Sequence, residues 1–194
     1  ETEGPVGING NDDRQDQAGL AHVHEHMLFK GTGRRGVGQI AAEVEASGGS
    51  INAWTSYDQT VYHIVMASRY ADNAVDILSD AIQSSAFEAG ELERELQVIQ
   101  EEISRSLDMP GRALSRNLFS TVYGAHPYGL PIIGTRESVD SFSREHVLEF
   151  FQSWYRPSNL TFIVVGDFDL EHMQQLIQEQ FGQMEDAPIP RQQR

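Results

Sequence analysis

Residues Gly19–Thr32 read GLAHVHEHMLFKGT, a stretch in which apolar and imidazole side chains are closely interleaved. Three of its apolar residues recur at spacings of three and four, which places them on one face of a helix: Leu20, Val23 and Met27. The pattern predicts a helix over 19–30 whose apolar face packs on a core, and the glycine at position 31 helps to end it. The other faces carry histidines and a glutamate, which are available for chemistry.

The flanking sequence predicts further helices and a β-hairpin. Apolar periodicity and stop signals indicate helices at 37–46, 73–84, 89–107, 111–122, 143–154 and 169–181. Residue composition indicates strands at 6–8, 50–56, 60–67 and 160–165, the middle two forming the hairpin. Few strands among several helices predict an α+β fold, with helices packed on a mostly antiparallel sheet. We assign residues 1–182 to one domain and residues 183–194 to a linker-like tail that connects to another domain.

Bulk composition narrows the function classes. A chain of 194 residues is long enough for one domain with a sizeable core. Its net charge of −15 argues against a nucleic-acid partner, because phosphates require a basic surface. No apolar run is long enough to span a bilayer. The chain has no cysteine, so any transition metal must be held by His, Asp or Glu side chains.

The first candidate motif lies on the helix predicted for the quoted stretch. His22 and His26 are four residues apart and therefore point the same way, with Glu25 between their directions. Two imidazoles one turn apart can each offer a ring nitrogen to one zinc ion, and Glu25 can then act on a water molecule at that ion. The plain alternative is a solvated helix face that carries histidines. His24 points elsewhere, and we assign it no metal role.

A catalytic zinc site needs a third protein ligand, and the helix predicted at 89–107 offers one. Its core-facing residues recur at spacings of four, three, four and four: Leu92, Leu96, Ile99, Ile103 and Leu107. Glu95 and Glu102 flank this stripe on one side, where a carboxylate needs a partner. A metal ion is one such partner. The alternative is a solvated acidic face, to which Glu101 would also belong.

The two motifs together resemble a known pattern. The segment Gly19–Thr32 resembles the signature of the pitrilysin-type, or inverzincin, zinc metallopeptidases, a family that includes insulin-degrading enzyme and mitochondrial processing peptidase. That family takes its third zinc ligand from a glutamate on a downstream helix, with a second glutamate seven residues earlier. Here 75 residues separate His26 from Glu102, and Glu95 stands seven residues before Glu102. The resemblance extends over about 6–181.

The resemblance implies specific roles for these residues. It implies Zn²⁺ as the cofactor, with His22, His26 and Glu102 as its ligands. It also implies that Glu25 is the catalytic base and that Glu95 has a supporting role in catalysis. Its expected fold is one half of a two-half peptidase clamshell, whose second homologous half lies in the same chain or in a partner subunit.

The predicted strand after Gly49 carries the expected substrate-binding residues. In the resembling family the corresponding strand is a sheet edge, to which a peptide substrate adds as another strand through main-chain hydrogen bonds. The resemblance places Asn52 and Ala53 beside the scissile bond and Trp54 near a side-chain pocket. The alternative for Trp54 is a core or interface aromatic residue.

The sequence therefore supports three hypotheses about function. The leading one is a zinc-dependent endopeptidase domain that hydrolyses peptides or unfolded segments and needs a second half for full activity. The alternative is a non-catalytic structural or assembly subunit of a peptidase-like complex, for which an incomplete metal site is expected. A closed zinc-binding module would need a fourth protein ligand, for which we find no candidate. For the compartment, we favour the periplasm or another extracytoplasmic space over the cytoplasm.

Overall fold

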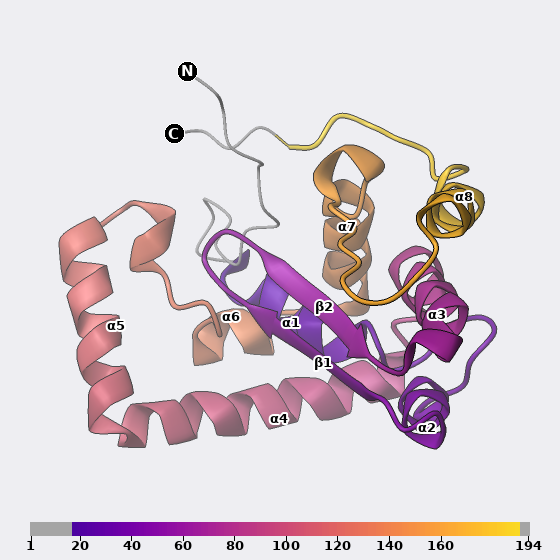
Figure 1. Ribbon diagram of the computed structural model, residues 1–194. Coiled ribbons are helices and arrows are strands. Elements are labelled where there is room, and N and C mark those ends of the chain that lie inside the picture. The colour runs from indigo at the N-terminus through magenta and orange to yellow at the C-terminus, as the bar shows by residue number, and fades with distance from the viewer. Residues whose placement is uncertain (1–16, 191–194) are drawn as a thin grey trace.

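The computed structural model describes residues 17–190 and consists mainly of helices around one hairpin (Figure 1). In chain order the elements are α1 (Leu20–Met27), α2 (Gln39–Ala46), β1 (Ser50–Thr55), β2 (Thr60–Val65), η2 (Ser68–Tyr70), α3 (Ala71–Ser84), α4 (Ala89–Asp108), α5 (Pro110–Tyr123), η3 (Pro127–Gly129), α6 (Arg136–Asp140), α7 (Arg144–Trp154), η4 (Pro157–Asn159) and α8 (Leu170–Phe181). The predicted α+β class is confirmed. Each predicted helix has a counterpart within about three residues, whereas the short helix α6 was not expected.

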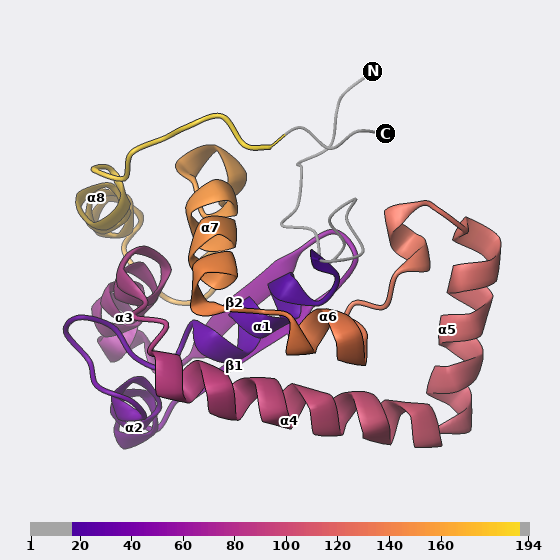
Figure 2. The ribbon, with the colours of Figure 1, turned by 180° about the vertical axis from the view of Figure 1, so that it is seen from behind.

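Helix α1 lies at the centre of the molecule, between the hairpin and a group of helices. It contacts both strands of the hairpin as well as α4 and α7. Figures 1 and 2 show the hairpin crossing one side of α1, with α4, α6 and α7 on the other. The three predicted core residues of the helix are buried at 0% to 3% exposure: Leu20, Val23 and Met27. Its apolar face is thus part of the main core, as the periodicity predicted.

The start of α1 depends on a close approach between two glycines. Gly19 precedes the helix with φ of 98°, a left-handed conformation that disfavours residues with a Cβ atom. A Cβ atom at this position would also lie 2.8 Å from Gly134 Cα, which is too close for van der Waals contact. These two glycines therefore allow the segment before α6 to pass directly over the first turn of α1.

Helices α4 and α5 meet at a sharp corner, and α5 stands away from the main core (Figures 1 and 2). Met109 is extended, with φ of −93° and ψ of 110°, because the ring of Pro110 disfavours helical geometry in the residue before it. Pro110 itself begins α5, where its missing N–H costs nothing. The predicted end of the long helix before Pro110 is confirmed.

The hairpin pairs β1 with β2 in antiparallel register, with Ala53 opposite Tyr62 and Thr55 opposite Thr60. Within residues 17–190, β1 pairs only with β2 and so has one open edge. Among the described residues, no helix is both long and apolar enough to cross a bilayer.

The strand predicted at 160–165 has no ladder partner in the described part of the chain. Leu160 is extended, with φ of −113° and ψ of 137°, yet the only sheet of residues 17–190 is the β1–β2 pair. β-Branched residues favour a pleated surface but form a strand only where another strand supplies hydrogen bonds. Residues 162–165 of the segment instead line a pocket together with Ile64 of β2 and Val75 of α3. The strand predicted at 6–8 lies outside the described residues.

His24 is a core residue of α1, which agrees with the absence of a metal role for it. Its Nδ1 atom lies 2.8 Å from the carbonyl oxygen of Leu20, and its Nε2 atom lies 2.8 Å from that of Val147 on α7. Phe87 and Phe150 pack against its ring. Burial lowers the pKa of His24 to about 4, although both carbonyl contacts favour the protonated ring. A neutral imidazole carries only one N–H, so at pH 7 the ring can donate to only one of these two carbonyl oxygens, that of Leu20 on its own helix or that of Val147 on α7.

This burial predicts a pH dependence of stability. Between about pH 6.5 and pH 4 the unfolded chain binds a proton at His24 that the folded chain does not. The free energy of unfolding should therefore fall as the pH falls through this window. The free energy of unfolding, measured by urea denaturation at several pH values, should change less steeply with pH for His24→Gln than for the unsubstituted chain. Equal slopes would contradict the burial of a neutral His24, since the other histidines contribute equally in both proteins.

Candidate metal centre

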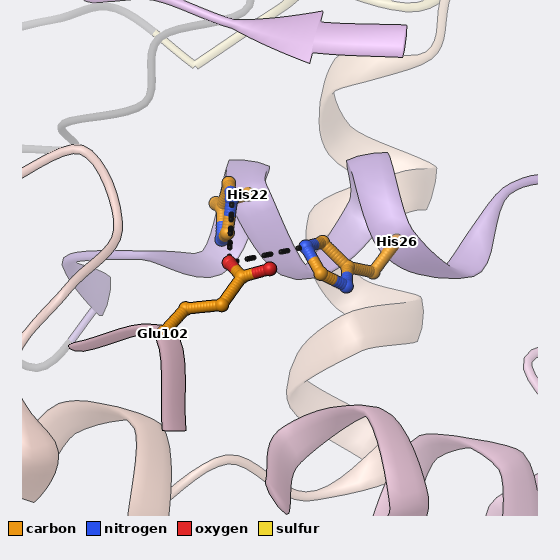
Figure 3. Close-up of side chains that lie close together, drawn as sticks. All are labelled: His22, His26 and Glu102. Atoms are coloured by element: carbon orange, nitrogen blue, oxygen red, sulfur yellow. Dashed lines mark ion pairs between the residues drawn. The ribbon is translucent and has the colours of Figure 1, made fainter. Parts of the chain in front are cut away.

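Three side chains from two helices meet where α1 faces α4 (Figure 3). His22 Nε2 lies 3.8 Å from Glu102 Oε2, and His26 Nε2 lies 3.7 Å from the same oxygen. One ligand atom from each residue lies within 4.8 Å of the others. In the part of the chain that the structure describes, this is the one group of His, Asp and Glu side chains that could hold a metal ion. The structure thus brings together the three residues predicted as ligands.

The donor set and its spacing fit a zinc ion. Bonds of about 2.0–2.1 Å in a tetrahedral site place the ligand atoms about 3.3 Å apart. The separations of 3.7 Å and 3.8 Å therefore need to shorten by only a few tenths of an ångström. Two nitrogens and one oxygen leave a fourth position open, which is typical of catalytic rather than structural zinc sites.

The protonation state of His22 suits metal binding. Burial, followed by the neighbouring His26 ring, lowers the pKa of His22 to about 3. The centroids of the two rings are 4.6 Å apart, so two positive charges there would repel each other. In addition, His22 Nδ1 is buried and has no hydrogen-bond partner among the described residues. His22 is therefore neutral at pH 7, with a lone pair available to a cation.

Glu95 determines which nitrogen of His26 faces Glu102. Its Oε2 atom lies 2.9 Å from His26 Nδ1, and Lys30 donates a hydrogen bond to its other oxygen. Burial would raise the pKa of Glu95, but the hydrogen bonds from Lys30 and His26 outweigh that effect and lower it. An ionised carboxylate can only accept, so His26 Nδ1 is the nitrogen that donates to Glu95, and Nε2 is the nitrogen that faces Glu102. A carboxylate behind a ligating histidine orients the ring and makes it more basic.

Glu25 lies on the same helix as the two histidines but points toward the hairpin. Thr55, the last residue of β1, donates a hydrogen bond of 2.6 Å from Oγ1 to Glu25 Oε2. Behind it, the hydroxyl groups of Tyr62 and Tyr155 lie 2.5 Å apart. Burial raises the pKa of both tyrosines, so these phenols stay neutral. Glu25 is half-buried and is not one of the three grouped donors.

The three predicted substrate-binding residues lie on β1 and alternate between its faces. Ala53 is half-buried on the same face as Thr55, which contacts α1 through Glu25. Asn52 and Trp54 are on the opposite face, and Trp54 is 43% exposed. This exposure argues against the alternative that Trp54 is a core residue. The Asn52 side chain accepts a hydrogen bond from the Ala53 backbone N–H.

Two residues that contact the site were missed from the sequence. Lys30, the only lysine of the chain, stands four residues after His26 and three residues beyond the end of α1. That spacing could have identified it as a partner of Glu95. Thr55 carried no such local signal, because its contact with Glu25 depends on how α1 packs against the hairpin.

Comparisons with known proteins identify the family of the chain. Residues 10–136 match the model of the insulinase family, peptidase family M16, and residues 141–194 match the model of the M16 inactive domain. The chain therefore belongs to the insulinase family of peptidases. It is 39% identical over 157 residues to an uncharacterized zinc protease of Rickettsia felis. The aligned region covers 81% of this chain and 38% of that protein. The chain spans only 38% to 40% of the length of the first curated relatives that it matches.

Solved structures of proteases share the fold. A protease from Helicobacter pylori matches with a TM-score of 0.91 and 27% identity, over 95% of this chain and 46% of that one. The periplasmic protease PqqL from Escherichia coli matches with a TM-score of 0.83 and 27% identity, over 97% of this chain and 22% of that one. This chain thus corresponds to part of each of these longer proteases.

The geometry predicts a large loss of zinc affinity in Glu102→Gln. Replacing a carboxylate ligand by an amide removes the charge that partly neutralises the cation, and we expect a loss of at least about 100-fold. Competition with a chromogenic chelator would measure it. Glu101→Gln is the matched control, because Glu101 is on the same turn with its side chain 75% exposed and contacts Arg105. Equal affinities in the two variants would exclude Glu102 as a ligand.

Proposed function

We propose that this chain is the metal-carrying domain of a zinc-dependent endopeptidase that hydrolyses peptides or unfolded segments. One observation carries the proposal: ligand atoms of His22, His26 and Glu102 lie within 4.8 Å of one another, and two nitrogens with one oxygen are a donor set typical of catalytic zinc. Membership of a peptidase family supports the same activity. The alternative, a non-catalytic assembly subunit, is disfavoured because such a subunit has no need of a complete donor set.

The residues of the chain divide the chemistry between them. A bound zinc ion supplies Lewis acidity, which acidifies water and polarises a peptide carbonyl. His22, His26 and Glu102 would hold the ion, and Glu95 keeps His26 in the required tautomer. Glu25 would accept a proton from water and pass it to the leaving amine. Its Oε2 atom is already bonded to Thr55, so Oε1 is the oxygen left for that proton.

The open edge of β1 is the proposed substrate-binding surface. An extended peptide can add to this edge through main-chain hydrogen bonds, which recognise a peptide largely independently of its sequence. We assign Asn52 and Ala53 to the scissile bond and Trp54 to a side-chain contact. The exposure of Trp54 leaves its indole ring accessible to such a ligand.

Full activity is proposed to need a second half. The chain spans 38% to 40% of the first curated relatives and 46% of the Helicobacter pylori protease. We propose that residues 1–182 form the zinc-carrying domain and that residues 183–194 lead toward the remainder. The second half would cover the edge of β1 and enclose the peptide. The likeness to a periplasmic protease supports an extracytoplasmic location.

We predict that Glu25→Gln keeps zinc but loses most peptide cleavage. Loss of a general base costs on the order of 100- to 10,000-fold in turnover, whereas the three donor side chains are unchanged. The measurements are zinc content and cleavage of a quenched fluorescent peptide by the full-length protein. Full turnover in a zinc-loaded Glu25→Gln variant would contradict the assigned role. If the unsubstituted protein itself cleaved no peptide, the assembly subunit would be favoured.

We also predict that this domain alone cleaves peptides poorly and that the second half restores turnover. Catalysis needs the reacting atoms held about 3–3.5 Å apart, and one open strand edge positions a peptide loosely. The test compares the zinc-loaded domain alone, mixed with the second half, and fused to it. Equal rates in the three samples would argue against a chamber formed by two halves.

A further inference from the structure

The Thr55–Glu25 hydrogen bond joins the two elements that the proposed reaction must bring into register. Glu25 belongs to α1, which carries two of the proposed zinc ligands, and Thr55 ends β1, which carries the proposed substrate-binding residues. The two are 30 positions apart in sequence. At 2.6 Å the bond from Oγ1 to Oε2 is short, as expected for a hydroxyl group that donates to an ionised carboxylate.

A second hydroxyl group favours this direction of the hydrogen bond. Thr60, which is opposite Thr55 in the ladder, has its Oγ1 atom 3.4 Å from Thr55 Oγ1. A hydroxyl group donates once and accepts twice. Because the carboxylate can only accept, Thr55 uses its single proton on Glu25 and can accept the proton of Thr60. Thr60 of β2 then donates to Thr55 of β1, which in turn donates to Glu25.

Because both partners are half-buried, the hydrogen bond can hold the Glu25 carboxylate in one orientation. Thr55, Glu25 and the neighbouring Tyr62 are each half-buried, and Tyr155 is buried. In such surroundings bulk water competes weakly for the carboxylate, so the hydroxyl group restricts its orientation. A carboxylate held by one oxygen presents the other in a defined direction, which proton transfer requires.

We infer that Thr55 is a positioning residue for Glu25, which fixes the base relative to the strand that binds the peptide. The inference rests on the proposed function. Nothing in the family comparisons assigns this residue a role. Thr55 does not contact the three proposed zinc ligands; it acts through Glu25.

The test uses the zinc-loaded full-length protein and a quenched fluorescent peptide. Thr55→Val removes the hydroxyl group while keeping the β-branched shape, and should lower kcat about 10- to 100-fold with KM nearly unchanged. Thr55→Ser keeps the hydroxyl group and should remain within about threefold of the unsubstituted protein, given the strength of the retained hydrogen bond. Both variants should retain zinc, because neither change touches a donor.

A double-mutant cycle separates action through Glu25 from a direct effect on the peptide. In the Glu25→Gln background, Thr55→Val should cause no further loss beyond about twofold, since residues that act as a unit are non-additive. A crystal structure of Thr55→Val should also show the Glu25 carboxylate turned away from its present position, and that of Thr55→Ser should show it unchanged.

Three results would overturn the inference: unchanged kcat in Thr55→Val, equal losses in Thr55→Ser and Thr55→Val, or additive losses in the double variant. A wrong inference is distinguishable from a wrong function. If Glu25→Gln is inactive while Thr55→Val is normal, only the role of Thr55 is lost. If Glu25→Gln is fully active, the proposed base itself is wrong.

Discussion

The burial of α1 on nearly every side is the constraint on which the arrangement of the site depends. This helix has only eight residues, yet it contacts β1, β2, α4 and α7. Its apolar residues enter the core, His24 reaches the backbone of α7, and His22 and His26 face α4. Because each face has its own partner, the helix cannot rotate or slide without breaking several contacts at once. The nitrogens of the proposed metal site are therefore held in place by packing that has no direct part in the proposed chemistry.

The electrostatics of the centre favour a cation. Two carboxylates from α4, Glu95 and Glu102, lie against two histidines of α1. Lys30 balances Glu95, whereas Glu102 has no cationic partner among the residues that the structure describes apart from those imidazoles. His22 is neutral at pH 7 because it is buried beside another imidazole. The result is a site with two imidazole rings and a carboxylate that pairs with no Lys or Arg side chain of the described residues, which is a suitable environment for a divalent ion.

The hairpin connects this centre to the proposed peptide surface. Alternation along β1 directs Ala53 and Thr55 toward the α1 side and leaves Asn52 and Trp54 on the other face. A shift of register by one residue would reverse both sets. Pairing with β2 prevents such a shift, and the contact between Thr55 and Glu25 ties the register of the strand to the helix. The proposed alignment of substrate and the orientation of the proposed base thus depend on the same hydrogen-bonded pair of strands.

The contrast between sequence and structure follows from the range of the interactions. The sequence alone determined what repeats locally: the helical spacing of Leu20, Val23 and Met27, the common direction of His22 and His26, and the helix end before Pro110. Its place beside an apolar stripe made Glu102 a candidate, but its grouping with the histidines was predicted through resemblance to a family, because no local rule relates His26 to a residue 76 positions further along the chain.

Tertiary structure alone decided which side chains form hydrogen bonds with residues that are distant in the sequence. Glu95 binds His26 over 69 residues, His24 reaches Val147 over 123, and Thr55 bonds Glu25 from a different layer. The expected strand at 160–165 depended in the same way on a partner that its own composition does not specify. Periodicity records which face of an element is apolar, but hydrogen-bond partners are chosen by packing, and packing brings together residues whose spacing in the chain carries no signal.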